Sequence, residues 1–405
     1  MANKYWRGGT GTWNGTNTAN WAAAATAATF TASQATTVLT VTAVASGTIT
    51  NGDTVWHTNG TSLGTITSFG TGTGGTGTYN MSASATVTSR TMSSATVGSA
   101  VPGATDDVIF DVDSNVGTAT CTVTAATATA LCNNFTASGL DGALTFAGSI
   151  GLTISGNLSV PASNFTRTFT GAITFNATAT GKTIASNGVT WSSAITFNGV
   201  GGGWTLSDAL SNASTVTLTN GSLSLSTFTL TATTFSSTNT NTRTLDYGTG
   251  KIVLTGNSGT IFNTGTPTGL TISGTPQVDC TYSGATGTRT IAPAALAEGS
   301  TTSFSITAGT DIVVFSSSSA IKSLTFTGFS GSWSNVALTI YGNLTVSTGM
   351  TVSAGANVIT MAATSGTQNI TSNGKTLDFP VTFNGVGGTF KLIDAMTLGS
   401  TRTAT

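Results

Sequence analysis

Carboxylates are the main candidates for chemistry in this sequence, and they gather in one stretch. Asp106 and Asp107 are adjacent, whereas Asp111 and Asp113 are two residues apart and share one face if the segment is a strand. The run DVDSN at 111–115 resembles the start of a calcium loop, with Asp111, Asp113 and Asn115 as oxygen ligands. Thr122 stands where such a loop carries its bidentate Glu. We therefore favour a solvated acidic segment, and these three residues remain the one weak calcium candidate.

The residues needed for common catalytic sites are scarce. Glycoside hydrolysis uses paired carboxylates, and Glu298 is the only Glu beside the Asp residues. A catalytic triad would rest on the single histidine, His57, and zinc would lack a second His or a paired Cys. Cys121, Cys132 and Cys280 fit buried core thiols, and a Cys121–Cys132 disulfide is not expected in a reducing compartment. We predict no catalytic residue, no cofactor and no enzyme activity.

The first 21 residues are rich in aromatic side chains. Tyr5, Trp6, Trp13 and Trp21 stand among Gly, Asn and Thr. One interpretation is a cap, because the exposed end of a repetitive β-structure must be covered. The alternatives are an attachment surface or a sugar-stacking site.

The composition indicates an all-β protein with few charges. Charged residues make up 6% of the chain, against roughly a quarter in ordinary globular proteins. The hydrophobic fraction of 38% and the alternation of apolar residues with Thr and Ser indicate strands with one buried face. A net charge of -1 does not provide the positive charge that binding to nucleic acid or an anionic membrane would need. We also expect neither a membrane-spanning helix nor a secretory signal peptide.

A long internal repeat relates two parts of the chain, the first of which begins near residue 152 and the second near residue 338. LTISGNLSV at 152–160 returns as LTIYGNLTV at 338–346, and ITFNGVGG at 195–202 returns as VTFNGVGG at 381–388. Both pairs have an offset of 186 residues. We expect the two copies to form equivalent coils, with Phe197 matching Phe383.

Short strands separated by Gly, Asn or Ser predict a parallel β-solenoid, in preference to a string of β-sandwich domains. Residues 1–35 are expected to be the N-terminal cap or attachment segment, residues 36–95 a small inserted β-module, and residues 96–405 the solenoid with its two copies. At 20-odd residues per coil, about 14 coils are expected. Within them Leu152, Ile154, Leu338 and Ile340 should point into the core, with the intervening Thr outside.

Several segments resemble those of known proteins. The pairing of YWRGGTGTWNGTNTANW at 5–21 with VPGATDDVIFD at 101–111 resembles the start of bacterial and phage surface β-solenoids. Residues 36–95 resemble a small β-module of structural and tail proteins of tailed phages. The SNG and ITFNGVGG repeats are similar to segments of predicted tail-fibre proteins of marine and uncultured phages. The resemblance implies a virion component and carries no catalytic residue over.

These observations predict a non-enzymatic structural or adhesive component of a phage virion, such as a tail fibre, that presents a host-recognition surface. It would be assembled in the host cytoplasm and located on the extracellular particle. Its expected partners are other virion proteins, further copies of itself (a trimer among the states considered) and a host surface glycan or protein, with no nucleic acid and no membrane insertion. The first alternative is a bacterial extracellular adhesin or filament subunit, and the less favoured one a polysaccharide-degrading tailspike.

The last residues carry a separate expectation. At the 186-residue offset, Thr405 aligns with Thr219, which lies inside a predicted strand. An uncapped solenoid end exposes backbone polar groups and an apolar cross-section. We therefore expect either a longer native polypeptide or another chain over residues 396–405.

Overall fold

A computed structural model describes residues 1–58 and 60–405. The described residues form a parallel β-solenoid of about 13 turns, with an aromatic cluster near the N-terminus and a small antiparallel module, and they contain no α-helix. The predicted fold class is thus confirmed. The chain divides into two compact units, the first comprising residues 1–177 and 182–193, and the second residues 178–181 and 194–405.

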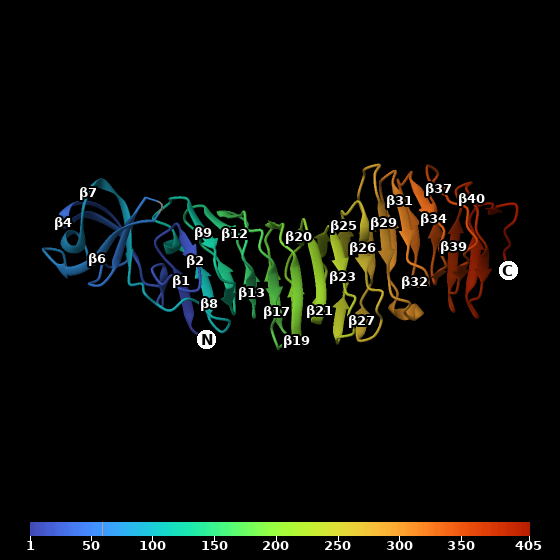
Figure 1. Cartoon of the computed structure of the whole chain (residues 1–405), viewed down its shortest axis with the longest axis horizontal. Coiled ribbons are helices and arrows are strands. Elements are labelled where there is room, and N and C mark those ends of the chain that lie inside the picture. Colours follow the sequence, from blue (N-terminus) through green and yellow to red (C-terminus); the bar gives the residue numbers. More distant parts are fainter. Residues whose placement is uncertain (59) are drawn as a thin grey trace. The chain divides into compact units, whose positions relative to one another are not determined.

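The first unit begins the solenoid with three columns of parallel strands (Figure 1). Within a column each strand pairs in parallel with the equivalent strand of the next coil, so a coil buries its apolar residues against its neighbours. One column contains β1 (Asn3–Trp6), β8 (Asp107–Phe110), β11 (Phe135–Ala137), β14 (Leu158–Ser159) and β17 (Lys182–Ala185). A second contains β10 (Ala130–Cys132), β13 (Leu152–Ile154) and β16 (Ile173–Phe175). The third contains β2 (Gly11–Trp13), β9 (Cys121–Ala125), β12 (Leu144–Gly148) and β15 (Phe165–Arg167).

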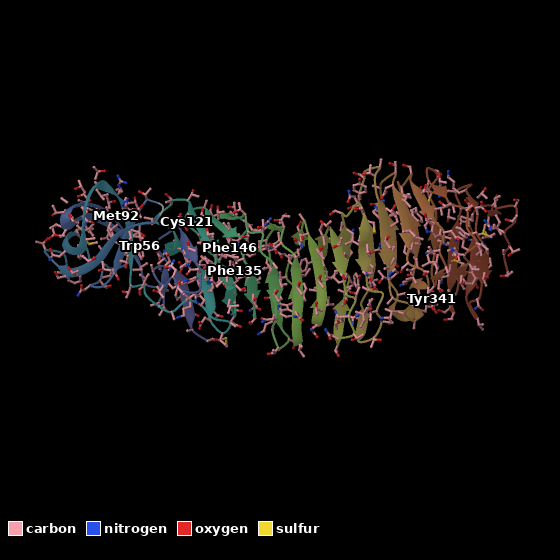
Figure 2. The ribbon with its side chains drawn as sticks, viewed as in Figure 1. Trp56, Met92, Cys121, Phe135, Phe146 and Tyr341 are labelled. Carbon is pink, nitrogen blue, oxygen red and sulfur yellow. The ribbon has the colours of Figure 1, made fainter. Side chains whose placement is uncertain are left out.

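Aromatic rings cover the beginning of these columns. Trp6, Trp13 and Trp21 are each at most 1% exposed. The Trp21 ring meets the Trp6 ring at 5.0 Å and the Trp13 ring at 5.3 Å, both edge-on. Below them the stack continues through Phe135 and Phe146, whose ring centroids lie 5.3 Å apart (Figure 2). Large apolar rings therefore cover the solenoid core at the first described coil.

The module is an antiparallel sheet with its own core. Its strands are β4 (Ala28–Ser46), β5 (Thr54–His57), β6 (Thr61–Phe69) and β7 (Gly77–Ala95), drawn in blue in Figure 1. Leu39, Ile66 and Tyr79 are among the buried residues of this core. β4 begins at Ala28, before the expected module boundary at residue 36. Trp56 packs instead with Ala95 and Val116, and so joins the module to the first coil.

Strand β4 curls until its two ends meet. A Cβ atom on Gly47, just after β4, would lie 1.8 Å from the carbonyl oxygen of Ala27, just before it. Gly47 also has a φ of +72°, in the region that other residues rarely adopt. Only glycine therefore permits this closure.

The second unit continues the same architecture. Its first column contains β19 (Ile195–Leu206), β21 (Thr215–Ser224), β23 (Thr234–Ser236), β26 (Gly259–Asn263), β29 (Thr288–Ala292), β31 (Ile312–Phe315), β34 (Ser332–Ser334) and β37 (Thr351–Val352). The second half of β21 pairs onward with β24 (Arg243–Asp246) and β27 (Leu270–Ser273). The second column contains β32 (Ser319–Ile321), β35 (Leu338–Ile340), β38 (Ile359–Met361) and β41 (Val381–Phe383).

A third column in this unit contains β20 (Leu210–Asn212), β22 (Thr229–Ala232), β25 (Lys251–Leu254), β28 (Gln277–Cys280), β30 (Ser303–Ile306), β33 (Leu324–Phe326), β36 (Leu344–Thr345), β39 (Thr367–Thr371) and β42 (Thr389–Leu392). Two further strands, β40 (Thr376–Leu377) and β43 (Thr397–Leu398), pair with each other. Residues 403–405 bond to Val381 and Phe383 of β41.

The inward positions of the short strands are apolar, as predicted. Leu152, Ile154, Leu338 and Ile340 are each at most 2% exposed, whereas the intervening threonines are half-buried. The register prediction for these strands is confirmed. Because every coil repeats this alternation, the core is a narrow apolar stack bounded by rows of Thr and Ser.

The two copies of the 186-residue repeat keep the same strand pairing but lie in different columns of the solenoid. Leu152 pairs with Ile173 in one copy, and Leu338 pairs with Ile359 in the other, at the same offset. The ring contact between Phe197 and Trp204, at 5.5 Å, likewise returns between Phe383 and Phe390, at 5.3 Å. Within the second unit, however, 195–197 lie in the first column and 381–383 in the second. The two segments thus share one ring contact, but 195–206 form the continuous strand β19 whereas 381–392 divide into β41 and β42. Phe197 and Phe383 also occupy different columns, which differs from the expected equivalence.

Two arginines with almost no exposed surface hold loops of the second unit. Arg243 donates from Nε to Ser237 Oγ at 2.6 Å, and its terminal nitrogens donate to the carbonyl oxygens of Ser237, Asn241, Thr266 and Thr268. Arg289 instead forms a two-point ion pair with Asp311, with both distances 2.7 Å and both side chains 0% exposed. These loops have left the strand ladder, so their carbonyls need other donors. We call these two sets of contacts the Arg243 corner and the Arg289 corner.

Candidate functional site

The acidic stretch after β8 is built around an ion pair with the N-terminal segment. Asp111 caps the 3-10 turn Val112–Ser114 and accepts a hydrogen bond from the backbone N–H of Asp113 at 3.1 Å. The Arg7 guanidinium donates to both carboxylate oxygens of Asp111, at 2.7 and 3.1 Å. Arg7 also donates to the carbonyl oxygens of Trp6 and Ala25, and its side chain is 1% exposed. Asp111 therefore neutralises the buried Arg7 guanidinium. In the sequence Arg7 precedes the antiparallel module and Asp111 follows it.

The calcium candidate residues do not share a ligand position. Asn115 is buried, and its amide donates to the carbonyl oxygens of Ala119 and Ala143 while its side-chain oxygen accepts from Cys121 Sγ. Asp111 is bonded to Arg7, which leaves Asp113 as the one member of the set with a free carboxylate. Among residues 1–58 and 60–405, no three His, Cys, Asp or Glu side chains are placed to hold a metal ion.

Asp106 and Asp107 lie apart from this group and hold the chain in place. Asp106 accepts from the backbone N–H of Gly103 at 3.0 Å. Asp107 Oδ1 accepts from the side chains of Asn133 and Asn134, at 2.7 and 2.8 Å, and so links β8 to the next coil. Asp106 and Asp107 therefore each have a local bonding role.

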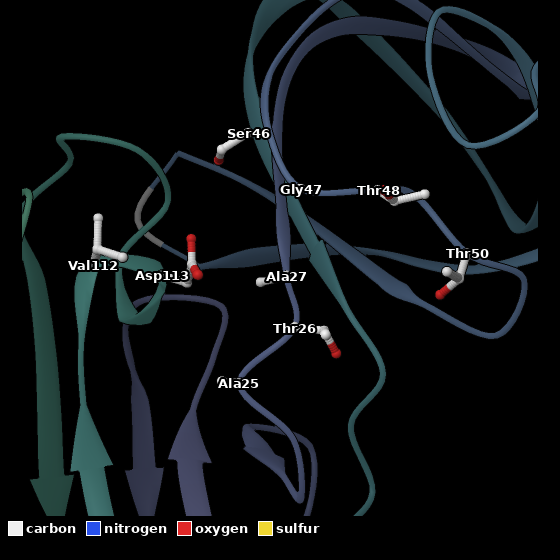
Figure 3. Close-up of a pocket in the computed structure, with 9 residues that line it drawn as sticks. All are labelled: Ala25, Thr26, Ala27, Ser46, Gly47, Thr48, Thr50, Val112 and Asp113. Atoms are coloured by element: carbon white, nitrogen blue, oxygen red, sulfur yellow. The ribbon is translucent and has the colours of Figure 1, made fainter.

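A cavity of about 520 Å³ opens beside Asp113 (Figure 3). Val112 and Asp113 come from the 3-10 turn, and the other lining residues come from the two segments that flank the curled strand β4, at 25–27 and 46–50. Val112 is 50% exposed although it is aliphatic. Because most of the lining residues come from the two ends of β4, the cavity depends on the closure at Gly47, which brings these ends together.

Asp113 is the charged group of this cavity. Burial raises the pKa of its carboxyl above the ordinary value, Arg7 acts in the opposite direction, and Asp111 and Asp141 raise it further. Its carboxylate oxygens have no hydrogen-bond or ion-pair partner in residues 1–58 and 60–405. The surroundings therefore favour a ligand that brings positive charge.

The histidine and the cysteines lie elsewhere. His57 Nδ1 lies 2.9 Å from Thr58 Oγ1, and burial and the nearby Arg90 lower the His57 pKa. Cys121, Cys132 and Cys280 are free thiols in the core, and burial raises the pKa of Cys121 and of Cys280 to about 12. Their thiolate forms are therefore scarce at neutral pH.

The N-terminal aromatics are divided between the core and its edge. Trp6, Trp13 and Trp21 form the cap and have no face open to a sugar. Tyr5 is half-buried, and the Arg7 guanidinium lies 5.1 Å from its ring centroid. Of the four residues, only Tyr5 keeps surface that a partner could reach.

The sequence analysis named Asp113 only as a calcium candidate and did not predict the cavity. The segments 25–27 and 46–50 consist of Ala, Thr, Ser, Gly and Ile and carry no motif. A signal was available in Arg7, an isolated cation in an aromatic segment, which needed an acidic partner. That partner is Asp111. Because Asp111 is paired with Arg7, it does not act together with Asp113 as a ligand.

Comparison of the chain with family models, curated proteins and solved structures found no match. No helix within residues 1–58 and 60–405 is long and apolar enough to cross a membrane. The geometry itself defines the class: a parallel β-solenoid with an aromatic cap and an antiparallel module. Such a fold is compatible with a fibre or an adhesin.

Proposed function

We propose that this chain is a non-enzymatic structural and adhesive component of a phage virion, such as a tail fibre, whose surface recognises the host. The observation that carries the proposal is the coil stack itself. Each coil adds one level to a narrow apolar core and one level to outward rows of Thr and Ser, as in Leu152–Thr153–Ile154 and Leu338–Thr339–Ile340. A polypeptide of this kind extends a surface in one direction, and the surface is neutral and rich in hydroxyl groups.

The virion assignment is supported by the sequence resemblance of residues 5–21, 36–95 and 101–111 to phage and surface β-solenoid proteins. Other virion proteins and further copies of the chain are then its partners, and a host surface glycan or protein is its target. The hydroxyl rows suit hydrogen bonding to a glycan, since Thr and Ser each offer a donor and an acceptor.

The experiment is immunogold labelling of purified phage particles from the source population with antibodies raised against the whole chain. The proposal expects labelled projections on the particles and the intact chain in their mass spectrum. Labelling of bacterial cell surfaces in particle-free cultures would instead establish the bacterial adhesin. Release of reducing sugar from host polysaccharide by the purified chain would overturn the non-enzymatic part.

A further inference from the structure

We infer that the cavity beside Asp113 is a subsite for a hexosamine unit with a free amino group, carried on a surface polysaccharide. The inference deepens the proposed function and relies on it for the source of the sugar. Its basis is one carboxylate, several hydroxyl-bearing side chains and a small apolar surface that line one cavity.

The carboxylate sets the charge of the ligand. Asp113 has no partner in residues 1–58 and 60–405, whereas neighbouring Asp111 is already paired with Arg7. An ammonium group placed against Asp113 would form a charge-assisted hydrogen bond, which is stronger than a neutral one. A divalent metal ion would require several more oxygen ligands than this single free carboxylate supplies.

The hydroxyl groups favour a sugar over a simple alkyl amine. Thr26, Ser46 and Thr48 line the cavity, and their hydroxyls form no hydrogen bond with any residue of 1–58 or 60–405. Thr50 differs, because its hydroxyl donates to Asp53 Oδ1 at 2.7 Å and keeps only its acceptor capacity. A lysine side chain would leave these hydroxyls without partners, whereas the hydroxyls of a sugar would meet them.

The apolar part matches the remaining face of such a ligand. Val112 is half-exposed, and Ala25 and Ala27 also line the cavity. A pyranose ring has C–H groups that bury against aliphatic side chains. The volume of about 520 Å³ lies within the usual range of small-molecule sites, roughly 300–1,000 Å³.

The test is calorimetric titration of the full chain, at a mildly acidic pH at which most amines of the oligomer are protonated, with a glucosamine oligomer and with the N-acetylglucosamine oligomer of the same length. The inference expects binding of the free-amine oligomer and at least about tenfold weaker binding of the acetylated one, because acetylation removes the charge. Equal binding of the two oligomers, or binding of neither, would overturn it.

Variants locate the binding. Asp113→Asn should weaken binding of the free-amine oligomer about tenfold or more, and Thr26→Val by a few fold. Asp141→Asn removes the same charge from an exposed residue that lies outside the cavity and acts on the Asp113 carboxyl less than burial, Arg7 and Asp111 do, so it should change affinity less than about twofold. An equal loss in Asp113→Asn and Asp141→Asn would indicate non-specific attraction and defeat the inference.

Folding and function are read separately. Each variant is compared with the parent chain by thermal unfolding, and Thr26→Val provides a variant that keeps every charge. Labelled phage particles together with a chain that binds no amino sugar would sink this inference and leave the proposed function standing. Sugar binding by a chain absent from particles would do the reverse.

Discussion

The Arg243 and Arg289 corners bury the same charged group in different ways. Arg243 directs all of its donors to one hydroxyl and four backbone carbonyl oxygens, and no carboxylate takes part. Arg289 pairs with Asp311 and donates once to the carbonyl oxygen of Ala308, while its Nη1 has no hydrogen-bond partner. The rings of Tyr282 and Phe329 lie 5.6 Å from the Arg289 guanidinium.

The difference shows that a solenoid loop can hold a buried cation without an opposite charge if its carbonyls converge. At the Arg243 corner the loops 237–241 and 266–268 supply enough acceptors. At the Arg289 corner fewer carbonyls are in reach, and Asp311 and the aromatic faces replace them. The first arrangement depends on the path of the backbone, and the second depends on particular side chains.

Removal of Asp311 should have the largest effect. In Asp311→Ala the Arg289 guanidinium stays buried without its counter-charge, so the free energy of unfolding should fall by about 3–5 kcal/mol. Urea unfolding followed by circular dichroism measures this change. The double variant Arg289→Met with Asp311→Leu is the control, and it should recover most of the loss because neither charge remains. A single variant within about 1 kcal/mol of the parent chain would show that Asp311 is not needed.

Arg243→Met should rank second, at about 2–3 kcal/mol. The substitution removes five hydrogen bonds and leaves loop carbonyls without donors, although some of these are near enough to the surface for water to replace the arginine. Limited proteolysis should show new cleavage at 237–241 or 266–268, and urea unfolding should give the magnitude. Arg243→Lys keeps the charge with fewer donors, so an effect as large as that of Met would mean that hydrogen-bond geometry dominates over charge.

Phe329→Leu should weaken the Arg289 corner by about 1–2 kcal/mol. The substitution removes the ring face beside the guanidinium and a small buried volume. Phe235→Leu, in a ring stack with no arginine over it, is the matched control for volume alone. If thermal unfolding gave equal losses in both variants, the ring would contribute packing and no cation–π attraction.

Acid should have the smallest effect, and it should act through Asp246 in the same strand as Arg243. Hydrogen bonds from Ser224 and Ser273 lower the pKa of Asp246 below its ordinary value, with burial opposing them. Since the folded-state pKa is depressed, the stabilisation is present above the unfolded-state pKa of about 4 and is lost as the pH falls through the folded-state value. Urea unfolding at several pH values should show a shallower acid dependence in Asp246→Asn. An unchanged slope would refute this role.

The fold could be predicted because its signals are local. Alternation in segments such as Leu152–Thr153–Ile154 specifies the buried face, and Gly and Asn mark the bends. The sequence TRT at 242–244 and 288–290 also contains a usable signal that was missed. Leu245 and Ile291 point inward, so Arg243 and Arg289 must do so as well, two residues earlier on each strand.

The candidate site could be predicted only in part because its members are far apart in sequence. The DVDSN run suggested that Asp111, Asp113 and Asn115 act together. Asp111 instead pairs with Arg7, which is 104 residues away in the sequence. The walls of the cavity come from both ends of β4, which meet only because that strand curls. Spacing along the chain contains no information on either event.

Within the second unit, the two copies of the 186-residue repeat lie in different columns, and this affects where their exposed side chains lie. The NGVGG segment presents Val200, 72% exposed, within the bulged first-column strand β19, and Val386, 88% exposed, in the turn that follows the second-column strand β41. The repeat length therefore does not equal a whole number of turns, and the duplicated loop faces a different direction in each copy. The duplication therefore places one segment on two different faces of the second unit, whereas a copy spaced by whole turns would have placed it twice on the same face.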